Sequence, residues 1–275
     1  MRHSIITINL NNKFGLLKTI NSVISQTSND FEYIIIDGGS TDGSVDLIKQ
    51  FSEKIAYWVS EYDGGIYQAM NKGIRIAQGE YVQFINSGDW LVADDVIEKM
   101  LKALPECSIF YGNMLKILPN GKIIRDRCEA GKISMLTFIK GSLNHTPNLI
   151  KRSLFEKYGF YDESLKIVSD WKFYLNAVGL HDEPVAYIDL DIAWFDMKGI
   201  SNINKSLHMK ERKTVLKELL PSSVLMDYDA FTDDIQIIQR LKRIKSIWFC
   251  IQFLYKFMSR VDKASKYYLH EKIDK

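Results

Sequence analysis

The chain has 275 residues, of which 46% are hydrophobic and 25% charged, and this length can bury a substantial core in one large domain or two small ones. Its formal net charge is only +2, and we expect no nucleic-acid partner. The three cysteines, Cys107, Cys128 and Cys250, are far apart and odd in number, which argues against a disulfide framework or a zinc-ligand cluster and favours a reducing compartment.

The first half of the chain alternates predicted strands with predicted helices. Apolar, β-branched runs predict strands at 4–10, 32–37, 55–60 and 81–85, and helical spacing predicts helices at 15–25, 42–51 and 67–77. This repetition predicts an α/β fold with a mostly parallel central sheet flanked by helices. The first run is too short and too broken by Asn for a secretory signal, so we expect a cytoplasmic protein.

Polar segments follow three of these strands. They are NLNN at 9–12, DGGSTDGS at 37–44 and NSGD at 86–89. Because ligands of such folds bind outside the carboxyl ends of the strands, we expect the three segments to converge on one crevice.

The second half is less regular. A hairpin is predicted from 108–118 and 121–125, with its turn at Pro119, Asn120 and Gly121. Further on, the pattern predicts a helix at 169–178, strands at 184–190 and 193–195, and a helix at 206–220. Residues 221–234 are expected to form a loop that separates this body from the C-terminal tail.

The tail is basic, whereas the rest of the chain is acidic. Residues 240–275 hold ten Lys or Arg against three Asp or Glu, and residues 1–239 hold 26 against 31. From Ile244 onward apolar residues recur at helical spacing, but the run is about half as long as the roughly 20 residues of a spanning helix. A helix lying in an anionic membrane surface through residues 240–270 is therefore favoured, and a helix docked on its own domain or a partner subunit is the alternative.

Three acids near strand ends are candidates for chemistry. Asp37 precedes two glycines that allow close approach of a ligand, and Asp63 precedes another glycine pair. Asp89 is the single acid of NSGD, whereas metal loops commonly carry two or three. Mg²⁺ or Mn²⁺ can complete its shell with waters and substrate phosphates, so one carboxylate is sufficient for a metal that arrives with its nucleotide.

Several ordered motifs together resemble family 2 of the inverting glycosyltransferases, the GT-A type that builds bacterial surface polysaccharides. They cover roughly residues 3–200 and comprise SIITINLNN, SVISQT, YIIIDGGSTDGS, DGGIYQAMNKGI, FINSGD and GFYDESLKIVSDWKFYL. The chain departs from the family at Leu10, where an aromatic residue is frequent, and at 69–71, where Ala-Met-Asn replaces the frequent Ala-Arg-Asn.

The resemblance implies roles for particular residues. The nucleotide would be bound by Thr7, Asn11, Asp37, Asp63 and Lys72, and Asp37 favours a UDP-sugar because an Asp usually accepts the uracil N3 proton in this family. Asp89 would bind Mg²⁺ or Mn²⁺, Asp170 would be the general base, and His145 and Trp171 would lie on the acceptor side. Residues 198–201 would form a loop over the diphosphate.

The implied protein transfers a sugar from a nucleotide-sugar donor to a saccharide or lipid-linked saccharide acceptor at the inner face of the cell membrane. A GT-A domain at 1–220 would have a nucleotide-binding half, 1–115, and an acceptor half, 116–220, followed by a linker and basic amphipathic C-terminal helices at 221–275. A catalytically silent GT-A domain that binds nucleotide or a partner enzyme is the alternative. A nucleotidyltransferase is less favoured, because only Lys13 lies near the first strand to hold phosphate.

Overall fold

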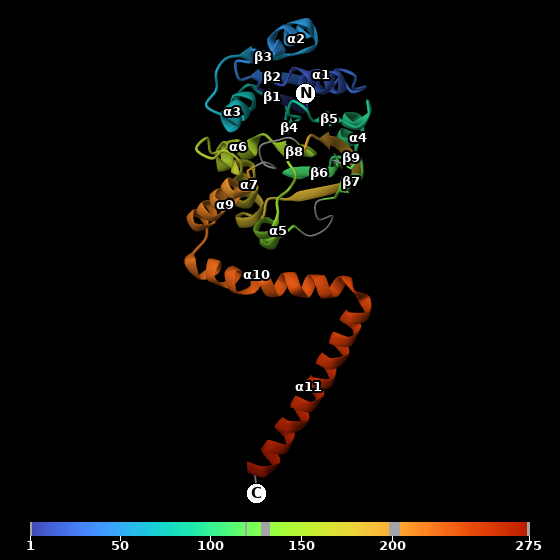
Figure 1. Ribbon diagram of the computed structural model, residues 1–275, viewed down its shortest axis with the longest axis vertical. Coiled ribbons are helices and arrows are strands. Elements are labelled where there is room, and N and C mark those ends of the chain that lie inside the picture. Colours follow the sequence, from blue (N-terminus) through green and yellow to red (C-terminus); the bar gives the residue numbers. More distant parts are fainter. Residues whose placement is uncertain (1, 119, 128–132, 198–203, 274–275) are drawn as a thin grey trace. The chain divides into compact units, whose positions relative to one another are not determined.

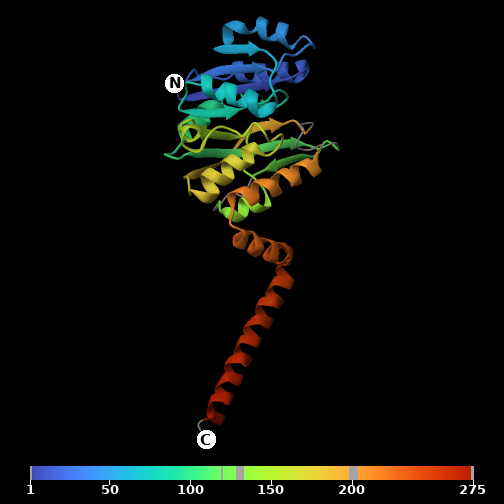
Figure 2. The same ribbon diagram turned by 90° about the vertical axis from the view of Figure 1, so that its left-hand side faces the viewer.

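The computed structural model describes residues 2–118, 120–127, 133–197 and 204–273. The chain divides into two compact units, Met1–Val215 and Leu216–Lys275. The first unit carries the sheet and the helices that cover it, and the second is helical (Figures 1 and 2). The predicted division of residues 1–220 into a nucleotide half and an acceptor half remains a prediction.

The N-terminal half alternates strands and helices as predicted. Its elements are β1 (His3–Asn9), α1 (Lys13–Ile24), β2 (Phe31–Asp37), α2 (Ser44–Gln50), η1 (Ser52–Lys54), β3 (Tyr57–Ser60), α3 (Ile66–Ile76) and β4 (Tyr81–Phe84). Asn12 caps the N-terminus of α1, and its side-chain oxygen accepts a hydrogen bond from the backbone N–H of Gly15.

The second half begins with a short strand and ends in long helices. Its elements are β5 (Trp90–Leu91), α4 (Val96–Ala103), β6 (Ile109–Ile117), β7 (Ile123–Asp126), α5 (Met135–Lys140), β8 (Asn148–Lys151), α6 (Ser153–Tyr158), α7 (Ser169–Tyr174), η2 (Leu175–Leu180), β9 (Val185–Phe195), α9 (Lys205–Leu219), α10 (Ser222–Arg243) and α11 (Lys245–Ile273). The hairpin of β6 and β7 is confirmed.

The strands of the described residues join in one sheet of order β3-β2-β1-β4-β8-β6-β9-β5, with β7 on β6. The strands β3, β2, β1 and β4 are mutually parallel. Antiparallel pairing begins where β8 joins β4 and continues where β6 joins β8, whereas β6 and β9 are again parallel, so the sheet is mixed. The N-terminal parallel part places the ends of β1, β2 and β4 at one edge.

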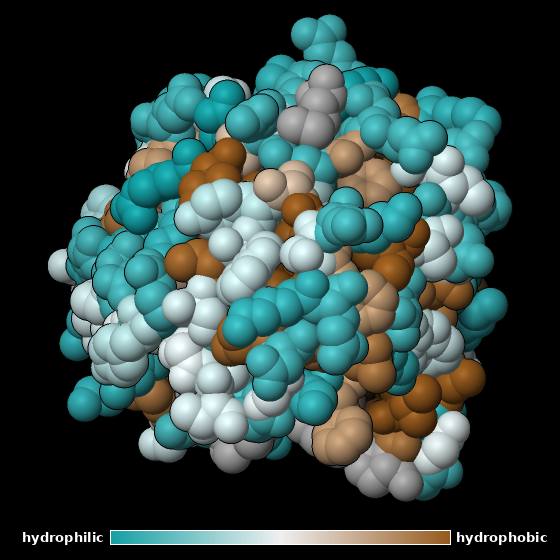
Figure 3. Space-filling view, turned by 90° about the horizontal axis from the view of Figure 1, so that it is seen from above, coloured by the Kyte–Doolittle hydropathy of each residue, from teal (hydrophilic) through white to brown (hydrophobic). Residues whose placement is uncertain are grey.

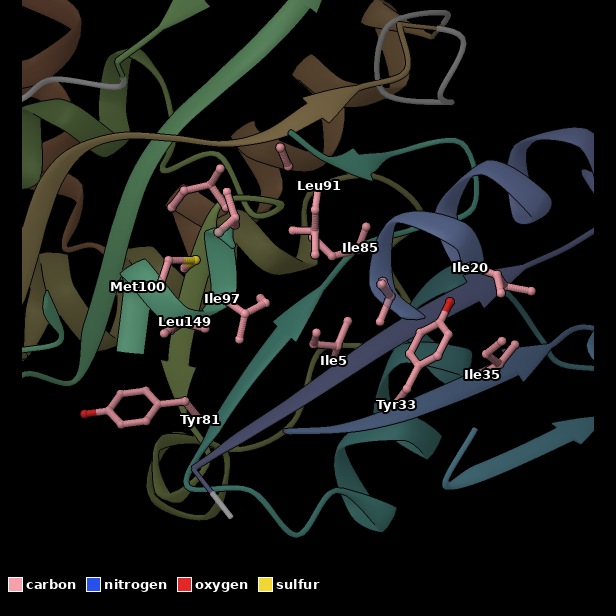
Figure 4. Packing of buried hydrophobic residues seen from close by; sticks show 14 of the residues in the cluster. Ile5, Ile20, Tyr33, Ile35, Tyr81, Ile85, Leu91, Ile97, Met100 and Leu149 are labelled. Carbon is pink, nitrogen blue, oxygen red and sulfur yellow. The ribbon is translucent and has the colours of Figure 1, made fainter. Parts of the chain in front are cut away.

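The core of this unit is aliphatic and aromatic. Ile5, Tyr33 and Ile35 of the parallel strands pack with Ile20 of α1 and Ile97 of α4 (Figure 4). Gly73 lets α3 lie directly on the sheet, because a β-carbon there would come within 2.6 Å of the Ile6 side chain of β1. Close packing of α3 on β1 and β2 fixes where the loop before α3 enters the cleft.

The tail differs from its prediction at residues 221–234. The prediction of a loop there is wrong, because helix α10 begins at Ser222, directly after Pro221, and continues to Arg243. Proline suits this place, since its fixed φ and missing N–H are tolerated at a helix start. Among the described residues, no helix is long and apolar enough to cross a membrane.

The surface of the molecule seen from the α2 end is mainly hydrophilic, with apolar side chains scattered in small groups (Figure 3). Scattered apolar side chains of this kind are normal for a globular surface. We therefore look for function in the cleft at the strand ends.

Candidate active site

A cleft of about 690 Å³ lies at the carboxyl ends of β1 and β4. Its walls come from the loops after these strands, the start of α3, the segment before β8, and helices α7 and α9. The lining side chains include Asn9, Leu10, Asp63, Tyr67, Asn86, Asp89, Lys116, His145, Lys166, Asp170, Trp171, Asp196, His208 and Arg212. The predicted crevice is therefore present for two of the three strand ends, 9–12 and 86–89, whereas residues 37–44 do not line it. It holds Asp63, Asp89, His145, Asp170 and Trp171 together.

Asp170 stands at the start of α7 with its carboxylate held from two sides. The Tyr67 hydroxyl donates to its Oδ1 at 2.9 Å, and His145 Nδ1 lies 3.7 Å from its Oδ2. The side chain is 19% exposed, so it faces the cleft while remaining fixed. A carboxylate held in this way can accept a proton from a hydroxyl bound in the cleft.

His145 and Thr146 connect this acid to the loop after β4. His145 Nε2 lies 3.1 Å from Asn86 Nδ2, and Thr146 donates to Asp89 Oδ2 at 3.0 Å. Burial lowers the pKa of His145, with the charge of Asp170 acting in the opposite direction. The family resemblance implied a place for His145 on the acceptor side of the cleft, and in the structure His145 lies between Asn86 and Asp170.

Asp89 has a second acid beside it, which the sequence analysis missed. The backbone N–H of Asp196 donates to Asp89 Oδ1 at 2.8 Å, and a β-carbon at Gly88 would lie 2.9 Å from Asp196 Oδ2. Burial raises the pKa of Asp89 to about 7, although hydrogen bonds from Asp196 and Thr146 oppose the rise.

These oxygens fit a hard divalent cation. Mg²⁺ and Mn²⁺ favour carboxylate oxygens and accept substrate phosphates and waters for the rest of their shell. Within the described ranges, no group of three or more His, Cys, Asp or Glu is arranged to hold a metal. Asp89 and Asp196 would thus supply the protein's share of the shell, with the donor's phosphates completing it.

Asp37 organises the strand ends from a fully buried position. Its carboxylate accepts from Asn9 at 2.7 Å, from the Ser40 and Ser60 hydroxyls at 2.6 Å each, and from the backbone N–H of Ser40 at 2.9 Å. Burial acts against ionisation, but hydrogen bonds from Ser40, Ser60 and Asn9 outweigh it and hold the pKa of Asp37 below its ordinary value.

Asp63 lies on the cleft wall close to Gly38 and Leu10. A β-carbon at Gly38 would come within 2.9 Å of Asp63 Oδ2 and 3.3 Å of Leu10 Cδ1. Burial raises the pKa of Asp63, while the Gly65 N–H and the charge of Lys72 lower it. Leu10 and Asp63 therefore pack closely around Gly38, and both line the cleft.

Four residues assigned to nucleotide binding do not line the cleft, namely Thr7, Asn11, Asp37 and Lys72. Thr7 is fully buried and donates to the carbonyl of Ile85 at 2.7 Å. Because β1 is buried on both faces, the sequence pattern could not show which side chain points outward, and Asn9 is the one that reaches the cleft.

Asn11 and Lys72 have local partners. Asn11 accepts from the Thr41 N–H at 2.8 Å and thereby fastens the loop after β1 to the loop after β2. Lys72 pairs with Glu61 at 2.9 Å, so its charge is balanced by a neighbouring loop. The lysines and the arginine that do line the cleft are Lys116, Lys166 and Arg212.

Trp171 is almost entirely buried and does not offer a ring face. Its indole N–H donates to the Phe138 carbonyl at 2.9 Å, and the Arg212 guanidinium lies 4.3 Å from its ring centroid. Burial lowers the pKa of Arg212 to about 10, with the charge of Asp170 acting in the opposite direction. Trp171, expected on the acceptor side, therefore packs into the wall of the cleft, and the loop expected at 198–201 lies outside the described residues.

Comparisons with known proteins show which family the chain resembles. Glycosyl transferase family 2 matches residues 4–159. An uncharacterised glycosyltransferase of Mycobacterium tuberculosis is 34% identical over 208 residues, covering 72% of this chain and 76% of that protein. A PGL/p-HBAD biosynthesis glycosyltransferase of Mycobacterium bovis is 27% identical over 206 residues, covering 72% and 78%.

Solved structures share the fold at low identity. S. aureus TarS in complex with UDP-GlcNAc has a TM-score of 0.63 at 18% identity, covering 75% of this chain and 61% of that chain. The mannosyltransferase PcManGT from Pyrobaculum calidifontis, in complex with GDP-Man and Mn²⁺, has a TM-score of 0.56 at 16% identity, covering 77% and 60%. The GT-A fold is thereby confirmed, although the shared part spans less than two thirds of either structure. The matched residues 4–159 and the relative at 34% identity show that the chain belongs to glycosyl transferase family 2.

Proposed function

We propose that this glycosyltransferase is an inverting enzyme that transfers a sugar from a UDP-sugar to a saccharide or lipid-linked saccharide in polysaccharide biosynthesis. The observation that carries the proposal is that one cleft of about 690 Å³ holds both the Asp89–Asp196 acid pair and the clamped Asp170 carboxylate. A reaction in which a nucleoside diphosphate leaves needs groups that stabilise the negative charge of the diphosphate and a base that takes the proton of the attacking hydroxyl. The cleft offers both.

The reaction is a single displacement at the anomeric carbon. Asp170 accepts the acceptor's hydroxyl proton while that oxygen forms a bond to the anomeric carbon. The bond from this carbon to the diphosphate oxygen breaks, and UDP leaves with the electron pair. Attack opposite the leaving group inverts the configuration. A divalent cation at Asp89 and Asp196 would neutralise charge on the departing diphosphate.

A uridine donor is supported by the strand ends. Asp37, Ser40 and Asn9 form a polar network at the ends of β1 and β2, and Asn9 lines the cleft together with Leu10 and Asp63. The TarS structure contains UDP-GlcNAc, a donor of the proposed type. The PcManGT structure contains GDP-Man, so a guanosine donor is the outcome that would replace this assignment.

A lipid-linked acceptor and a membrane surface are supported by α11. Its described exposed side chains include Ile247, Phe249, Phe253, Leu254, Tyr255, Phe257 and Met258. A broad apolar face beside cations suits the interface of an anionic membrane. We place the enzyme at the cytoplasmic face, where an exposed free thiol such as Cys250 stays reduced.

Turnover with a panel of nucleotide sugars tests the proposal. UDP release from UDP-sugars, with and without Mn²⁺, reports donor choice and metal use, and NMR of the product reports its anomeric configuration. Thermal shifts with UDP and GDP, read in parallel, report binding because a ligand of the folded state raises its stability. Binding of UDP without turnover, under conditions that turn over a related enzyme, would favour a catalytically silent domain. Retention of configuration would exclude the single displacement.

A further inference from the structure

We propose that Tyr67 and His145 are positioning residues that clamp the Asp170 carboxylate and tie it to two separate donor-side loops. The inference rests on the proposed function of Asp170 as the base. Neither residue would exchange a proton with the substrate. Their effect is on the orientation of Asp170, and the contacts on each oxygen come from different parts of the chain.

Tyr67 supplies the first contact. It lies in the first turn of α3, directly after the Asp63-Gly64-Gly65 loop, and only 5% of its surface is exposed. Its Oη is 2.9 Å from Asp170 Oδ1 and 2.6 Å from the carbonyl of Ile167. Burial, reinforced by the charge of Asp170, holds the pKa of Tyr67 well above its ordinary value. The hydroxyl therefore keeps its proton and donates it to one of these oxygens.

His145 supplies the second contact. With Asn86 Nδ2 donating to Nε2 at 3.1 Å, a neutral imidazole carries its proton on Nδ1, which faces Asp170 Oδ2 at 3.7 Å. Burial, which lowers the pKa of His145, favours this neutral form. The next residue, Thr146, holds Asp89 at 3.0 Å, so one short segment touches both acids.

The two contacts make the base depend on the donor site. Tyr67 follows the loop that carries Asp63 along the chain, and His145 is bonded to Asn86 at the start of the loop that carries Asp89. A displacement of either loop would therefore change the contacts that orient the Asp170 carboxylate. A shift of about 1 Å in a reacting group can lower a rate about 100-fold, so the clamp acts on turnover more than on donor binding.

Tyr67→Phe tests the first contact, because it removes the hydroxyl and keeps the ring. Tyr161→Phe is its matched control: Tyr161 lies 5.7 Å from Tyr67 between ring centroids, and within the described part of the chain its hydroxyl makes no hydrogen bond. We expect Tyr67→Phe to lower kcat about 10- to 100-fold with an unchanged KM for the donor, and Tyr161→Phe to retain kcat. Equal kcat values for the two variants would overturn the role of Tyr67.

A pair of amide variants tests the second contact. The amide nitrogen of Asn takes the place of Nδ1, so His145→Asn keeps a donor toward Asp170. The amide of Gln reaches the place of Nε2, where its oxygen can accept from Asn86 Nδ2, so His145→Gln keeps only the contact with Asn86. We expect His145→Asn to retain more of kcat than His145→Gln. The reverse order would show that the Asn86 contact alone matters and would overturn the clamp.

Two further measurements separate the clamp from a merely structural role and from the proposed function. In an Asp170→Asn background, Tyr67→Phe should cause no further loss of kcat, whereas additive losses would mean that Tyr67 acts elsewhere.

Nitrogen-15 NMR of His145 reports the tautomer without any turnover. A proton on Nδ1 supports the clamp, and a proton on Nε2 would overturn it even in an active enzyme. A chain with the Nδ1 proton that fails to transfer any sugar would instead refute the proposed function.

Discussion

The backbone N–H of Asp196 donates to the carboxylate of Asp89 at 2.8 Å, across 107 residues of chain. Thr146 holds the other oxygen at 3.0 Å, and burial raises the pKa of Asp89 to about 7. The nearby charge of Asp196 contributes to that rise, because two carboxylates in one place disfavour each other's ionised form. A divalent cation bound at the proposed site would offset this disadvantage by pairing with both carboxylates.

Replacing either acid should therefore reduce metal-dependent transfer. We expect Asp89→Asn and Asp196→Asn each to lower Mn²⁺-stimulated UDP release by about 100-fold or more, because removing one of two charged ligands weakens the hold on the diphosphate charge. Asp95→Asn is the control, since Asp95 pairs with Lys99 on a partly exposed helix. Turnover that does not respond to metal or to its removal by EDTA would contradict the assignment.

Removal of the base should separate binding from chemistry. Asp170→Asn preserves the shape of the side chain, and the amide cannot accept the acceptor's proton. We expect transfer to fall by about 10²- to 10⁴-fold, while the thermal shift given by UDP stays at its wild-type size. An Asp170→Asn enzyme with normal kcat would require a different base in the cleft.

The buried Asp37 should matter for stability as well as for UDP. The Asp37 carboxylate accepts hydrogen bonds from Asn9, Ser40 and Ser60. In Asp37→Asn, the new NH₂ group can only donate, so it is placed against groups that also donate. We expect a loss of about 1–3 kcal/mol in the free energy of unfolding, measured in urea, and a smaller thermal shift with UDP. Asp46→Asn, an exposed change beside Lys49, should leave both unchanged. Unchanged unfolding of Asp37→Asn would show that the buried network is dispensable.

A histidine remote from the cleft should make the protein sensitive to acid. His3 is fully buried on β1, and burial, opposed by the charge of Asp30, lowers its pKa to about 3. The unfolded chain binds a proton near the ordinary value of about 6.5, whereas the folded chain does not until about 3. The contribution of the neutral, buried His3 to the free energy of unfolding is thus fully present above pH 6.5, and it is lost as the pH falls toward 3.

A His3→Gln variant tests this expectation. It should show a shallower fall of unfolding free energy between pH 6.5 and 4 than wild type, whatever its stability at neutral pH. Unfolding in urea at a series of pH values measures the slope. Parallel slopes for the two proteins would show that His3 does not cause the acid sensitivity.

The C-terminal helix should bind anionic membranes. We expect a chain ending at residue 243 to lose most of its co-sedimentation with phosphatidylglycerol vesicles, and the binding of the full chain to weaken in high salt. Substituting Ser for Phe253 and Phe257 should weaken binding while leaving charge unchanged, which separates the apolar contribution from the electrostatic one. Equal vesicle binding by the full and shortened chains would leave α11 as a packing helix.

Sequence patterns reveal local structure and chemistry better than contacts between distant segments. The strand ends, Asp37 and Asp89 could be predicted because each lies in a motif whose order along the chain is informative. Asp196 could not, since no spacing rule connects it to a loop 107 residues earlier. Thr7 was misassigned because β1 is buried on both faces and alternation gives no direction.

The tail shows a different limit of sequence patterns. Residues 221–234 contain Pro, Ser and several Asp, which are typical of loops, yet they form the start of α10. Pro and Ser are also typical of helix starts, so composition alone did not distinguish a loop from a helix that begins there.

The pairing of β5 with β9 has a consequence for the order in which the enzyme is made. Asp196 directly follows β9, which ends at Phe195. During synthesis the ribosome therefore makes the loops of Asp37, Asp63 and Asp89 long before it makes Asp196. A nascent chain has its nucleotide loops early but lacks the acid pair until β9 joins the sheet. The proposed metal centre is therefore completed only after β9 has been made, and the proposed sugar transfer would begin no earlier.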